Sequence, residues 1–139
     1  KLIMLIDKYD NLNYQKDIYQ TIIHHYKIQG KTTDEAKIYK EFSDKFNTEP
    51  HILNGYAWRM SELKLNLEDA LLKSVSAINF TEDEPEQQAN ILDTKAEVLW
   101  ILGRYDDAIS TINLAIDIKP DSDYFSDQKI KFQNSKTEE

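Results

Sequence analysis

The stretch ANILDTKAEVLWILGRYDDAISTINLAIDIKPDS, residues 89–122, decides the fold. Apolar residues recur at steps of three or four before Gly103 and again after it, which places them on one face of an α-helix in each half. Glycine tolerates the positive φ that ends a helix, and Asp106 and Asp107 suit the positive end of the next helix dipole. The stretch therefore predicts two amphipathic helices joined by a tight turn. The apolar positions are Leu92, Ala96, Leu99, Ile109, Ile112 and Ile116.

The same arrangement recurs along the chain. Pro50, Pro85 and Pro120 stand 35 residues apart, and a fixed period of this size is typical of stacked helical repeats. Proline fits the first turn of a helix, so each is expected to mark where a helix begins. Two acidic residues followed by alanine recur at 34–36, 68–70 and 106–108, each after a residue that tolerates positive φ: Gly30, Asn66 and Gly103.

Apolar spacing extends the helical pattern over the whole chain. We predict helices at about residues 2–10, 13–29, 33–46, 50–63, 67–80, 86–102, 105–118 and 122–134. Because the chain starts at Lys1 inside the first of these helices, we expect it to be a fragment of a longer protein.

Composition narrows the classes of partner. The 139 residues include 40% hydrophobic residues, enough for a continuous core, and no apolar run approaches the roughly 20 residues of a membrane helix. The net charge of -8 repels phosphate backbones and anionic lipid headgroups. We therefore expect neither nucleic-acid binding nor membrane insertion.

Residues 89–122 resemble a tetratricopeptide repeat. The matching positions are Ala96, Leu99, Leu102, Gly103, Tyr105, Ala108, Ala115 and Pro120, with departures at Leu92 and Lys95. The resemblance implies an all-α fold, a right-handed superhelix of about three helix-turn-helix repeats. We expect one domain over 1–139 with units at about 16–49, 50–84 and 89–122, the first two matching less well, and a terminal capping helix at 122–134.

A narrower resemblance concerns residues 53–58, 66–70, 92–94 and 102–104. These segments are similar to helical repeats attached to thioredoxin-like domains in some bacterial envelope proteins. Any redox chemistry would then lie outside this chain, which contains no cysteine. The compartment stays open between the cytoplasm and a bacterial periplasm or envelope.

The tetratricopeptide resemblance also implies a partner-binding groove, lined by the first helix of each repeat. Two groove residues are the only tryptophans of the chain, and tryptophan is enriched where partners bury large surfaces. The full set is Asp17, Gln20, His24 and Lys27, then His51, Asn54, Trp58 and Ser61, then Asn90, Asp93, Glu97 and Trp100.

Two alternatives stay open for this groove. Trp58 and Trp100 either face a partner or pack between adjacent helices. Asp93 and Glu97, one helical turn apart, form either a negative patch for a Lys or Arg of a peptide or a solvated acidic face. Tetratricopeptide domains that grip acidic chaperone tails use Lys, Asn and Arg at such positions. The corresponding sites here carry Asp17, Gln20, Asn54, Asp93 and Glu97, of which only Asn54 fits that role. The expected partner is therefore a basic or apolar segment.

No motif for catalysis, a metal or a cofactor is present. His24 and His25 point about 100° apart on a helix, and neither has a ligand partner four residues away. Asp121 and Ser122 begin like a calcium loop, but Ser126 and Phe132 replace its required Gly and Glu, so a helix N-cap explains them better. The acidic run at 82–84 is expected to be solvated.

Two functions remain in competition. The first is a non-enzymatic scaffold that binds a peptide or helix of another protein in its concave groove. The second is an accessory or dimerisation domain of a larger envelope enzyme. In that case a second copy of the chain, in a homodimer, is a candidate partner. An enzyme built on the helices themselves is disfavoured.

Overall fold

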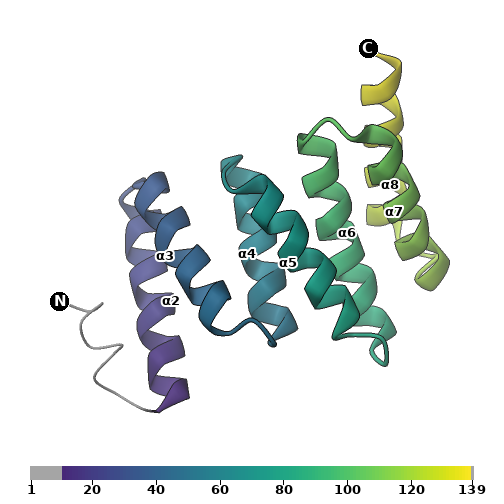
Figure 1. The fold of residues 1–139 in the computed structure, drawn as a ribbon. Helices are drawn as coiled ribbons and strands as arrows, with labels where there is room; N and C mark the ends of the chain where they lie inside the picture. The colour runs from purple at the N-terminus through teal and green to yellow at the C-terminus, as the bar shows by residue number, and fades with distance from the viewer. Residues whose placement is uncertain (1–10, 139) are drawn as a thin grey trace. The chain divides into compact units, whose positions relative to one another are not determined.

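The computed structural model describes residues 11–138, and over this range the fold is all-α, with no strand. The helices are α2 (Leu12–Ile28), α3 (Thr32–Lys45), α4 (Pro50–Leu63), α5 (Leu67–Asn79), α6 (Pro85–Ile101), α7 (Tyr105–Ile118) and α8 (Asp123–Thr137). Figure 1 shows antiparallel helix pairs within each part of the chain, such as α2 with α3 and α4 with α5. The expected all-α class is confirmed. The expected helix at 2–10 lies outside the described residues, and the handedness of a superhelix stays a prediction.

The chain divides into two compact units, Lys1–Phe46 and Asn47–Glu139. In the first unit, α2 and α3 pack as a hairpin around aromatic side chains. The ring of Tyr19 stacks on Phe42 with 5.0 Å between centroids, and Phe46 meets Phe42 edge-on at 5.4 Å. The side chain of Asn11 caps α2 by accepting the backbone N–H groups of Asn13 and Tyr14.

The second unit consists of two hairpins, α4–α5 and α6–α7, followed by α8. Small side chains let the helices approach closely, since Ala70, Ala77, Ala108 and Ala115 are all fully buried. α8 covers the apolar side of the second hairpin with two buried phenylalanines, Phe125 and Phe132. The remaining buried members of this cluster are Ala89, Leu92, Ala96, Leu99, Ala108, Ile112 and Ala115.

Helix starts follow the sequence signals with one exception. Pro50 and Pro85 occupy the first turns of α4 and α6, as expected. The expectation that Pro120 begins a helix is wrong, because it lies in the turn before α8. The helix begins after Ser122, whose hydroxyl accepts the Phe125 N–H at 3.2 Å. A helix start needs a side-chain acceptor for its free N–H groups, which the Ser122 hydroxyl provides and a proline side chain does not.

The turns between paired helices use left-handed backbone. Gly30, Asn66 and Gly103 have φ of 68°, 51° and 80°, as the sequence predicted. Lys64, at the end of α4, also has a positive φ of 57°, which no residue pattern indicated. A lysine pays a steric cost in this conformation that glycine avoids.

Candidate partner-binding face

The residues expected to line a groove lie on α2, α4 and α6. Asp17, Gln20, His24 and Lys27 are all exposed on α2, within the first unit. The others lie on α4 and α6, within the second unit. Since each unit is described by itself, a single groove across all three helices stays a prediction.

On α4, the expected groove residues lie opposite the core-facing side. His51 is exposed, and Asn54 and Trp58 are half-buried. Ser61 does not fit the expectation: its side chain is buried, and its hydroxyl donates to the carbonyl of Trp58 at 2.5 Å. The core-facing side carries the buried residues Ile52, Leu53, Tyr56, Ala57 and Met60.

Asn54 and Trp58 share one side of α4 because they are four residues apart. The side-chain oxygen of Asn54 is buried and has no hydrogen-bond partner among the described residues. A buried acceptor without a donor costs free energy, and the same burial keeps this oxygen out of reach of a donor from another molecule. The indole N–H of Trp58 also enters no hydrogen bond with the residues that the structure describes.

On α6, Asn90 is exposed, but Asp93 and Glu97 are buried beneath α8. The Gln128 amide donates to Asp93 Oδ1 at 2.9 Å and to Glu97 Oε1 at 2.8 Å. The ammonium of Lys131 donates to the same Glu97 oxygen at 2.7 Å. The expected open negative patch is therefore wrong, as is a solvated acidic face. A lysine does pair with Glu97, but it comes from the same chain.

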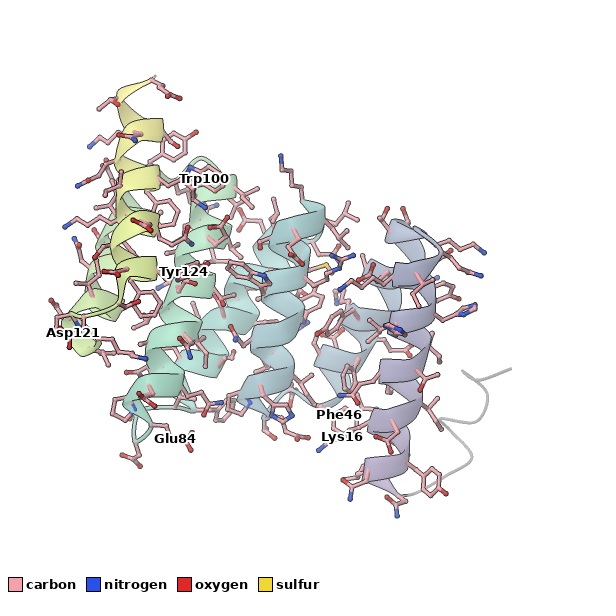
Figure 2. The ribbon with its side chains drawn as sticks, turned by 180° about the vertical axis from the view of Figure 1, so that it is seen from behind. Lys16, Phe46, Glu84, Trp100, Asp121 and Tyr124 are labelled. Carbon is pink, nitrogen blue, oxygen red and sulfur yellow. The ribbon has the colours of Figure 1, made fainter. Side chains whose placement is uncertain are left out.

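Trp100 packs between helices. Its indole N–H donates to the Ser135 hydroxyl at 2.8 Å, and its ring centroid lies 6.0 Å from that of Phe132. The Lys131 ammonium stands 4.2 Å from the centre of the indole, within the range of a cation–π interaction. Figure 2 shows Trp100 and Tyr124 along the seam between α6 and α8.

The pKa values of two side chains in this seam between α6 and α8 are raised. Burial raises the pKa of the Asp93 carboxyl from 3.8 to about 6, although the hydrogen bond from Gln128 opposes the rise. The negative charge of Glu97 raises this pKa further, while Lys131 and a hydrogen bond from Tyr124 lower it. Burial, together with the charges of Asp93 and Glu97, raises the pKa of Tyr124 to about 12.

Sequence reasoning missed the half of this seam that α8 supplies. Tyr124, Gln128, Lys131 and Ser135 recur at steps of four, three and four, so they form one stripe on the helix. A stripe of polar residues on a terminal helix is ordinarily assigned to solvent. This stripe of α8 matches Asp93, Glu97 and Trp100 on α6, which are also spaced by four and three residues. The match between the two stripes is the sequence signal that could have predicted contact between α6 and α8.

An open pocket of about 430 Å³ adjoins the seam at the side of Trp100. Its wall combines the rings of Trp100 and Tyr105 with the charged side chains of Lys64 and Glu138. Ile101 and Ser135 complete the lining. The pocket therefore offers an aromatic wall with one charge of each sign.

The described residues contain no group of three or more His, Asp or Glu side chains placed to hold a metal ion. Over the same range, no helix is both long and apolar enough to cross a membrane. No protein-family model matches this chain, and no curated protein matches it significantly.

Proposed function

We propose that this chain is a tetratricopeptide-type module that binds a peptide or helix of another protein. The proposal draws on the resemblance of residues 89–122 and on the succession of antiparallel helix pairs. The observation that carries it is the half-buried side chain of Trp58, on the side of α4 that faces away from the core. A half-buried aromatic side chain suits a segment that brings apolar side chains.

The proposed contact surface is therefore His51, Asn54 and Trp58 on α4, together with the exposed Asn90 on α6. The net charge of -8 favours a basic or apolar partner segment over an acidic one. Asp93, Glu97 and Trp100 take part in this surface only where the side chains of α8 leave them accessible.

A displayed library of random peptides, selected on the immobilised chain, tests the proposal. We expect enriched peptides that lose binding to a Trp58→Ala variant and keep it to a Leu72→Ala variant. Leu72 is the matched control, because it is a large apolar residue, 68% exposed, on α5. Failure to enrich any peptide, or equal binding to both variants, would contradict the proposal.

A further inference from the structure

Glu97 and Trp100 surround one ammonium group from two sides. The Lys131 ammonium lies 2.7 Å from a Glu97 oxygen and 4.2 Å from the centre of the Trp100 ring. The Phe132 ring adds a second aromatic face at 5.4 Å. A carboxylate and aromatic faces around a cation form a recognition site for ammonium groups. Lys131 of the same chain thus occupies this site and shows which kind of group it binds.

The site holds more negative than positive charge. Asp93 and Glu97 are both buried, and both accept hydrogen bonds from the neutral amide of Gln128. Lys131 is the cation that the described residues bring into ion-pair contact with Glu97. When Asp93 is ionised, one negative charge in the seam is left without a cation. A second cation would therefore be attracted to it.

The Lys131 side chain is more exposed than the phenylalanines that anchor its helix. The side chain of Lys131 is 38% exposed, whereas Phe125 and Phe132 anchor α8 in the core with 3% and 0% exposure. Solvent therefore reaches the Lys131 side chain at the site itself. The Lys131 side chain can consequently swing out by rotamer changes while α8 remains in place.

We propose that Glu97 and Trp100 form a receptor for a lysine side chain of a partner segment, and that Lys131 fills this receptor until such a segment displaces it. The inference rests on the proposed function, because it specifies a basic residue in the bound segment. It assigns to Lys131 the role of an internal competitor.

The test uses the two indole N–H signals of the chain, one from each tryptophan, resolved by NMR and assigned with a Trp58→Phe variant. A tetralysine peptide is titrated at about 0.15 M salt into the wild type and into Lys131→Met, which removes the ammonium and keeps the apolar stem. Lys129→Met is the matched control, since it removes the same charge from α8. Glu97→Gln removes the carboxylate charge of the receptor.

We expect tetralysine to shift the Trp100 signal and to bind Lys131→Met about fivefold more tightly than the wild type, as for loss of a partly exposed ion pair. Lys129→Met should bind like the wild type, and Glu97→Gln more weakly. Equal affinity of the two methionine variants, or equal shifts of both indoles, would indicate general attraction to an acidic protein and overturn the inference. Peptide binding that depends on Trp58 would survive that outcome, so the two proposals fail separately.

Discussion

The α4–α5 and α6–α7 hairpins follow the same plan, but their first helices meet different surroundings. On α6, Asp93, Glu97 and Trp100 are bound by side chains of α8. On α4, the Asn54 oxygen and the Trp58 indole N–H have no hydrogen-bond partner among the described residues. A residue at a predicted groove position is therefore available to a partner only if a later helix of the same chain does not already bind it.

The cover over α6 depends on the two buried phenylalanines of α8. Phe132→Ala removes a fully buried ring, and we expect it to destabilise the second unit by about 3–5 kcal/mol. Ile130→Ala, at a position 53% exposed on the same helix, should change stability by no more than about 0.5 kcal/mol. Urea unfolding followed by circular dichroism measures both. Similar losses for the two variants would show that α8 is not anchored in this way.

The buried carboxyl of Asp93 should make the stability of the seam between α6 and α8 depend on pH. The folded pKa of Asp93, about 6, lies above its ordinary value of 3.8. Its contribution to stability is therefore complete below pH 3.8 and is lost as the pH rises through 6. Asp93→Asn keeps an oxygen for Gln128 and has no charge to bury, so at pH 8 it should be more stable than the wild type by up to about 3 kcal/mol.

Unfolding at pH 4 and pH 8 checks this expectation, with Asp127→Asn, an exposed carboxyl on α8, as the control for loss of one negative charge. The advantage of Asp93→Asn should shrink to about 0.5 kcal/mol at pH 4. A variant that is less stable than the wild type at pH 8 would mean that the Asp93 charge strengthens the seam.

The α4–α5 and α6–α7 hairpins should be equally sensitive to overpacking between their two helices. Ala77 and Ala115 are fully buried on the second helices of the two hairpins. Replacing either with Leu is expected to overpack its hairpin and to cost about 1–3 kcal/mol, read from the shift in thermal unfolding. A loss at one position and none at the other would show that the hairpins are packed by different rules.

The smallest expected effect concerns the two turns. The left-handed position after α6 is Gly103, whereas the left-handed position after α4 is its C-cap Lys64, with φ of 57°. Lys64→Gly should stabilise the chain by about 0.5–1 kcal/mol, and Gly103→Ala should destabilise it by about 1 kcal/mol. Thermal unfolding of the two variants decides this, and a destabilised Lys64→Gly would mean that the lysine side chain makes compensating contacts.

The sequence was most informative where local chemistry sets the backbone. The bounds of α4 and α7 agree with the predicted 50–63 and 105–118 at both ends. The starts of α4 and α6 were readable because proline fixes φ at a first helical turn. The same rule failed at Pro120, where the Ser122 hydroxyl provides the cap two residues later. The positive φ of Lys64 carried no signal, since lysine has no preference for it.

The site was less predictable, because burial of a polar residue depends on the helix placed against it. Asp93 and Glu97 have the spacing of a surface pair, and Gln128 and Lys131 that of a solvated stripe. Each stripe taken alone indicates solvent, and only their combination indicates a buried seam. Trp58 and Trp100 were equal candidates for a partner until α8 was found to hold Trp100.

Hydrogen exchange of the two indole N–H groups, followed by NMR in D₂O, tests the central difference between α4 and α6 most directly. The Trp100 N–H is bonded to Ser135 in the seam and should exchange slowly, whereas the Trp58 N–H should exchange fast and become protected when a selected peptide binds. Equal exchange rates of the two indoles would mean that α8 does not protect Trp100. Slower exchange of Trp58 than of Trp100 in the free chain would mean that Trp58 is the covered tryptophan. Either result would contradict the proposed difference between α4 and α6.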